Sequence, residues 1–120
     1  MPINKAKNHF LGKDGFERMN CAQSMVYTFK KKFNIDVDIE SFKKYGGGRA
    51  PEGLCGALYA AEYILRKVNM TEKVKDLEKF FFDQASALKC RDIRREKKLS
   101  CLGCVEKCSE FLADIDNEKD

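Results

Sequence analysis

The sequence predicts an all-α protein, a single-domain bundle of about five mostly antiparallel helices with cysteines clustered at one end. Apolar residues recur at the three- and four-residue spacing of helices, and no run shows the period of two typical of strands. The length of 120 residues suits one domain with one modest core. We divide the chain into an irregular N-terminal arm (1–13), a helical domain (14–116) and an acidic tail (117–120).

The first long helix is expected over residues 15–33. Asp14 and Glu17 have the spacing of a capping box, in which two side chains satisfy free amides at a helix start. The apolar stripe of this helix consists of Ala22, Val26, Phe29 and Phe33. A turn over 34–37 and a short helix over 38–45 follow.

Glycines at 46–48 end the short helix, and the next helix is predicted to start at Pro51 or Glu52, because proline suits a first helical turn. Asn69 and Glu72 then predict a second capping box, followed by a helix that ends near Leu88. Its Phe80-Phe81-Phe82 triplet fits a core with one ring at an edge, or a homodimer contact.

Residues 91–98 read as a charged, partly helical connection, and Ser100 is predicted to cap the last helix. One face of that helix carries Cys101, Cys104, Cys108, Leu112 and Ile115. The segment 89–98 has six basic and two acidic residues, which favours a solvated connection. Nucleic acid is not the favoured partner, because no nucleic-acid motif with interleaved aromatic residues accompanies the basic run.

Six cysteines in so short a chain call for a disulfide, metal or redox explanation. The N-terminal residues lead into no apolar signal segment, and no run approaches the roughly 18 to 20 apolar residues of a membrane span. We therefore expect a cytoplasmic location. In a reducing cytosol, clustered cysteines more often bind metal or take part in redox reactions than form structural disulfides.

Helix order predicts that four of the cysteines meet. Successive helices with short connections are antiparallel neighbours. Cys55, at the start of one helix, should therefore share an end of the bundle with Cys90, at the end of the next, and with Cys101, at the start of the last. The short helix returns the chain from the other end, which brings Cys21 to the same place.

The local sequence around two of these cysteines favours thiolates. Cys55 and Cys101 lie in first turns, where free amides and the helix dipole stabilise negative charge, and Arg49 and Arg91 are near in sequence. The loop of Gly46, Gly47, Gly48 and Arg49 is a candidate cofactor-binding loop near the site.

The last two cysteines have different expected roles. Cys101 and Cys104 share a helix face, which suits a redox pair or two metal ligands, and Cys104 is a candidate resolving thiol. Cys108 is expected to be a core residue. A nucleophilic pair with His9, the sole histidine, has little support because it lies in the polar arm.

The order and spacing of several segments resemble the C_GCAxxG_C_C family of small redox-active proteins. The matching segments are Asn20-Cys21-Ala22-Gln23, Gly46-Gly47-Gly48, Cys55-Gly56-Ala57, Cys90-Arg91-Asp92 and Cys101-Leu102-Gly103-Cys104-Val105. The resemblance covers roughly residues 16–113 and implies redox or metal-binding roles for Cys21, Cys55, Cys90 and Cys101. The signature departs from the family pattern at Ala60, where the family has glycine.

Three functions remain open at this point. The first is thiol–disulfide exchange with a redox partner protein, in which Cys55 or Cys101 attacks and Cys21, Cys90 or Cys104 resolves. At least one thiol should then have a pKa below the free value of about 8.5. The second is a zinc or iron–sulfur centre held by Cys21, Cys55, Cys90 and Cys101. The third is a helical interaction module with buried cysteines.

Overall fold

The computed structural model describes residues 2–13, 15, 18–46 and 49–118, and this part of the chain is all-α, as predicted. Six α-helices and two short 3-10 segments replace the expected five helices. The α-helices are α1 (Pro2–Leu11), α2 (Cys21–Lys32), α3 (Gly56–Lys67), α4 (Lys73–Ala85), α5 (Cys90–Glu96) and α6 (Cys101–Glu118). The 3-10 segments are η1 (Ile39–Tyr45) and η2 (Pro51–Gly53).

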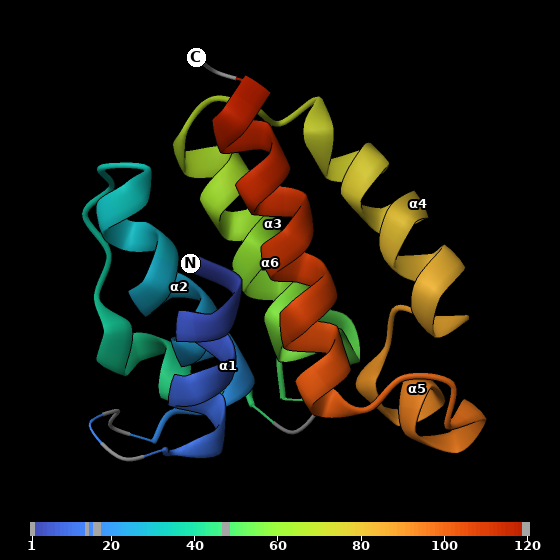
Figure 1. Ribbon diagram of the computed structural model, residues 1–120. Helices are drawn as coiled ribbons and strands as arrows, with labels where there is room; N and C mark the ends of the chain where they lie inside the picture. Colours follow the sequence, from blue (N-terminus) through green and yellow to red (C-terminus); the bar gives the residue numbers. More distant parts are fainter. Residues whose placement is uncertain (1, 14, 16–17, 47–48, 119–120) are drawn as a thin grey trace.

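Helices α3 and α6 lie side by side at the centre, with α1 and α2 on one side and α4 on the other (Figure 1). The apolar stripes predicted from the sequence form the core between them. Fully buried side chains include Phe29 from α2, Leu58 and Leu65 from α3, Phe81 from α4 and Leu112 from α6. Neighbours α3 and α4 are antiparallel, whereas α3 and α6 rise from the same end, so the expectation of mostly antiparallel packing holds only in part.

The N-terminal arm expected to be irregular is helical over Pro2–Leu11. Helix α1 packs against α2 and α6 through small or polar side chains, since Ala6 is fully buried and His9 is 6% exposed. Lys7 also forms an ion pair with Glu106 of α6, with 2.7 Å between Nζ and Oε2. Alanine and histidine contribute little to the apolar periodicity from which a helix is predicted, so the sequence pattern does not indicate this helix.

Helix α2 begins at Cys21, later than the predicted start at residue 15. Its cap is Asn20, whose side chain accepts a hydrogen bond from the Gln23 amide at 2.8 Å. The Gln23 side chain accepts one from the Asn20 amide in return, which completes a capping box. The predicted box residues Asp14 and Glu17 lie outside the described residues.

The starts of α3 and α4 also differ from the prediction. Pro51 begins the separate segment η2, and Cys55 is the N-terminal cap of α3. Asn69 adopts a left-handed conformation, with φ of 62°, and Glu72 precedes α4 without a capping hydrogen bond, so the predicted Asn69–Glu72 box is wrong. Asn69 instead reverses the chain after α3, a role that asparagine accepts more readily than most residues.

The charged connection predicted at 91–98 is largely helix α5, and Cys90 begins this helix instead of ending the previous one. Ser86, at φ of 65°, terminates α4 and redirects the chain. Ser100 caps α6 as predicted, because its Oγ accepts the Gly103 amide at 3.0 Å. Helix α6 continues to Glu118, so the chain remains helical at the start of the expected acidic tail.

The phenylalanine triplet of α4 has the predicted mixed environment. Phe81 is fully buried, Phe80 packs on Phe111 at 5.8 Å between ring centroids, and Phe82 is 52% exposed at the edge. Within the described ranges, none of the helices is both long enough and apolar enough to span a membrane.

Candidate functional site

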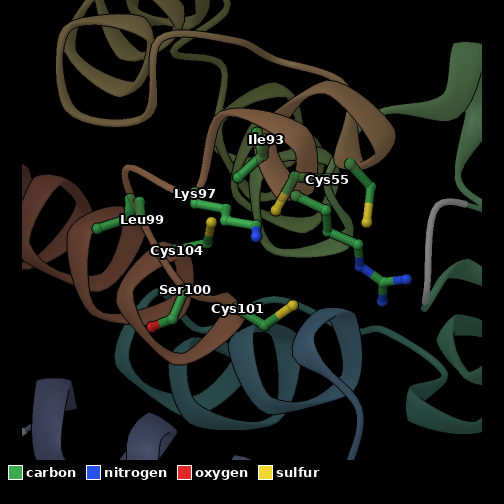
Figure 2. A pocket seen from close by; sticks show the side chains of 9 residues that line it. Cys55, Ile93, Lys97, Leu99, Ser100, Cys101 and Cys104 are labelled. Carbon is green, nitrogen blue, oxygen red and sulfur yellow. The ribbon is translucent and has the colours of Figure 1, made fainter.

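Four cysteines line one cavity of about 290 Å³ between α3, α5 and the start of α6 (Figure 2). They are Cys55, Cys90, Cys101 and Cys104. The remaining lining side chains are Ile93, Arg94, Lys97, Leu99 and Ser100. Three of the four cysteines predicted to converge therefore reach a shared space, together with Cys104, which was expected to assist them.

The cavity lies where several helices begin. Cys21, Cys90 and Cys101 are the first residues of α2, α5 and α6, and Cys55 caps α3. Figure 1 shows α5 and the first turns of α3 and α6 at the same lower end of the molecule. The sequence predicts that Cys55, Cys90 and Cys101 meet, but it places Cys21 inside a helix and Cys90 at a helix end, whereas both residues begin helices.

Backbone contacts hold Cys55 close to the α4–α5 connection. The Cys55 amide donates to the Leu88 carbonyl at 3.0 Å, and Leu54 forms an isolated antiparallel bridge with Lys89. Cys90 directly follows this bridge in the chain. The position of Cys90 beside Cys55 is therefore set by the backbone and does not depend on a sulfur contact.

Gly56 lets α2 and α3 approach each other at the site. A Cβ atom added there would lie 2.6 Å from the Cys21 sulfur and 2.8 Å from the Tyr45 carbonyl oxygen. Both distances are far below van der Waals contact, so this position requires glycine. The same geometry places the Cys21 sulfur against the start of α3, next to Cys55.

The surroundings of Cys55 and Cys21 favour the protonated form of both thiols. The hydrogen-bonded neighbour Cys104, followed by burial, raises the pKa of Cys55 well above its usual value, despite amide contacts from Leu58 and Ala57 that lower it. Burial, followed by the charges of Cys55 and Cys101, raises the pKa of Cys21 to about 12. At Cys55 the neighbour Cys104 and desolvation thus outweigh the helix-start effect, and the direction of the pKa is opposite to that expected of an activated thiolate.

Arg94 is a cation of the cavity wall that acts on two of its cysteines, and it is not among the residues predicted from the sequence. Burial raises the pKa of Cys90, while Arg94 acts in the opposite direction. The charge of Cys90 and a hydrogen bond to Cys101 in turn raise the pKa of Arg94. Arg94 follows Cys90 by one helical turn, so the signal was present once Cys90 was assigned to the start of a helix.

The two arginines that the sequence analysis favoured do not line the cavity. Arg49 donates from Nε to the Gly46 carbonyl at 3.1 Å, and Arg91 is absent from the cavity wall. Gly46 packs against the Asn20 side chain, which donates to the Lys43 carbonyl at 2.8 Å. This part of the loop braces the start of α2. The predicted cofactor-binding residues Gly47 and Gly48 lie outside the described residues.

Cys101 and Cys104 have contrasting positions although they are one turn apart. Cys101 is exposed, whereas Cys104 is 2% exposed and lies beside Cys55. Figure 2 shows both at the start of α6, bordering the same space as Cys55. An exposed sulfur next to an arginine and a buried sulfur behind it form an outer and an inner thiol.

The remaining candidates have structural surroundings. Cys108 is fully buried in the core, as predicted, and burial raises its pKa well above the usual value. His9 is buried against Tyr27 at 4.7 Å between ring centroids, away from the cavity lining. The described residues include all six cysteines, and among them no group of three or more His, Cys, Asp or Glu side chains is placed to hold a metal ion. The four cysteines predicted as metal ligands are thus not gathered into such a group in this part of the chain.

Comparison with known proteins gives one family match. No curated protein and no solved structure matches the chain. The family model described as "Putative redox-active protein (C_GCAxxG_C_C)" matches residues 19–115, a range that contains all six cysteines and every residue of the cavity wall. Because this match spans most of the sequence, the protein belongs to the C_GCAxxG_C_C family.

Proposed function

We propose that the protein carries out thiol–disulfide exchange, with Cys101 as the attacking thiol and Cys104 as the resolving thiol. The observation that carries this proposal is the placement of an exposed Cys101, near Arg94, one helical turn before a buried Cys104. A cation beside a sulfur stabilises the thiolate, which is the reactive form. An accessible first sulfur can reach a substrate, and a buried second sulfur one turn away is shielded from the substrate but can attack the first.

The proposed reaction has two exchange steps. The Cys101 thiolate attacks one sulfur of the substrate disulfide, a new S–S bond forms, and the other substrate sulfur leaves as a thiolate that takes a proton from water. Cys104 then loses its proton to solvent and attacks the Cys101 sulfur, which releases the second substrate thiolate. The substrate gains two electrons, and the cysteine pair becomes a disulfide that an external dithiol, such as a redox partner protein in a reducing cytoplasm, returns to thiols.

The start of a helix is a suitable place for this pair. Helical positions three apart have Cβ atoms about 5–6 Å apart, whereas a disulfide needs about 3.5–4.5 Å. The first turn of α6 must therefore tighten when the bond forms. Helix ends change conformation more easily than helix interiors, and Ser100 at the cap can release the Gly103 amide during that change.

Trapping of the mixed disulfide tests the division of roles. Cys104→Ser should react with an aromatic disulfide reagent, release one aromatic thiol and retain the other on Cys101, because no inner thiol resolves the adduct. The wild-type protein should release both aromatic thiols and end with a Cys101–Cys104 bond. Intact mass and peptide mapping identify the products.

The double variant Cys101→Ser, Cys104→Ser is the matched control and should form no adduct in the same time. An adduct that maps to Cys21, Cys55 or Cys90 in the Cys104→Ser protein would contradict the proposed roles. So would a stable adduct on Cys101 in the wild-type protein, because it would show that Cys104 does not resolve.

A further inference from the structure

The cavity has a charge and size that suit one class of substrate. Resting on the proposed exchange reaction, we infer that it selects small disulfides carrying an anionic group such as a carboxylate, which Arg94 and Lys97 hold while Cys101 attacks the sulfur. The proposal assigns a specificity to the basic segment around α5, which the exchange mechanism alone does not explain.

The basic side chains of this segment are divided between the cavity and other contacts. Arg94 and Lys97 line the cavity. In contrast, Arg95 donates to the Asp92 carboxylate at 2.9 Å, and Lys98 donates to the Asp83 carbonyl at 3.2 Å on α4. Figure 2 shows Lys97 reaching into the space bordered by Cys55, Cys101 and Cys104.

No acidic side chain offsets these two cations among the described residues of the cavity wall. Arg94 interacts with Cys101, the sulfur that is to react, and Lys97 reaches into the same cavity. An anion bound between them would be drawn toward Cys101, and the same cations would stabilise the thiolate that leaves when the substrate disulfide breaks. A positively charged substrate would meet repulsion at the same place.

The dimensions favour a small molecule over a protein. A volume of about 290 Å³ is at the lower end of the roughly 300–1,000 Å³ of ligand pockets. Ile93 and Leu99 add apolar wall, which suits the short methylene chain that links a sulfur to a carboxylate. Cys104 lies at the buried end, so a small substrate can bond to Cys101 and leave the inner thiol free to resolve it.

Rates of oxidation by three related reagents test the inference. The reduced full-length protein is mixed with dithiodipropionate, hydroxyethyl disulfide or cystamine, which are anionic, neutral and cationic. Each rate constant is divided by that of a small neutral thiol under the same conditions, which removes differences in intrinsic reactivity. We expect the anionic reagent to exceed the neutral one by about fivefold to tenfold at low ionic strength, and the advantage to shrink in salt.

Lys97→Gln should reduce the anionic-to-neutral ratio at least about threefold. Lys98→Gln is the matched control, because it removes the same charge from the adjacent residue, whose side chain points to α4, and it should retain the ratio. A ratio near one in the wild-type protein, equal ratios in the two variants, or faster normalised oxidation by insulin disulfides would each overturn the inference while leaving exchange intact. Absence of exchange with every reagent would overturn the proposed function as well.

Discussion

Replacement of Cys101 by serine is expected to slow the reaction of the reduced protein with a small disulfide at pH 7 by at least about 100-fold. Cys101 is the exposed thiol, and the other five cysteines are buried. Burial contributes to a raised pKa in Cys21, Cys55, Cys90 and Cys108, so little thiolate forms at these positions near neutrality. Stopped-flow measurement of thiol release gives the rate constants.

Cys108→Ala is the control for this experiment, because Cys108 is a core residue on the same helix and has no role in the proposed reaction. Its rate should stay within about twofold of the wild-type rate, while its stability falls by about 1 kcal/mol through loss of a buried sulfur. An equal loss of rate in both variants would indicate a general effect of helix α6 and would contradict the assignment of Cys101 as the attacking thiol.

The second large effect is expected at Glu62, a buried carboxyl group on α3, two residues after Ala60. Glu62 is 2% exposed, and its Oε2 has no hydrogen-bond partner among the described residues when the group is a carboxylate. Burial, followed by the neighbouring Glu78, raises the pKa of Glu62 from 4.5 to about 7, although Arg66 acts in the opposite direction. A proton on Glu62 or Glu78 allows the two carboxyl groups to share a hydrogen bond.

The sign of the pH dependence follows from this raised pKa. The folded protein binds the proton more tightly than the unfolded chain, so the stabilisation is complete below pH 4.5 and is lost as the pH rises to about 7. Each pKa unit corresponds to about 1.4 kcal/mol, and this group should lower the free energy of unfolding by up to about 3 kcal/mol across that interval. Urea unfolding at pH 5 and pH 8 measures the difference.

Glu62→Gln should remove most of this pH dependence and make the protein more stable than wild type at pH 8, because the amide is neutral at every pH. Glu40→Gln changes an exposed carboxyl group in η1 and should leave the pH dependence as it is. If the free energy of unfolding changed between pH 5 and pH 8 by the same amount in Glu62→Gln as in wild type, the buried carboxyl would not be the group that titrates.

The sequence was sufficient to predict the helical class and the convergence of the cysteines, because both depend on apolar spacing and connection length. It was not sufficient to predict α1. Its buried residues include Ala6 and His9, which are not strongly apolar. Their burial depends on the packing of α1 against α2 and α6, which the local sequence does not indicate. The predicted start of α2 was also wrong. Asn20 and Gln23 have the same three-residue spacing as Asp14 and Glu17, and it is Asn20 and Gln23 that form the capping box of α2.

The chemistry of individual thiols was the least predictable part of the site. A position at a helix start favours a thiolate at both Cys55 and Cys101, but the neighbour Cys104, followed by burial, reverses that preference at Cys55. Burial is set by the neighbouring helices and cannot be read from the local sequence. The choice of Arg94 over Arg91 depends in the same way on Cys90 starting α5, since only a residue one turn later reaches the sulfur.

We propose that these cysteines exchange disulfides and do not hold a metal. Anaerobic purification of the full chain, followed by metal analysis and a thiol count before and after one equivalent of disulfide oxidant, tests this proposal. We predict no stoichiometric metal, six thiols in the reduced protein, and the loss of two on oxidation, mapped to Cys101 and Cys104. Stoichiometric zinc or iron, with Cys21, Cys55, Cys90 and Cys101 protected until the metal is removed, would contradict the account.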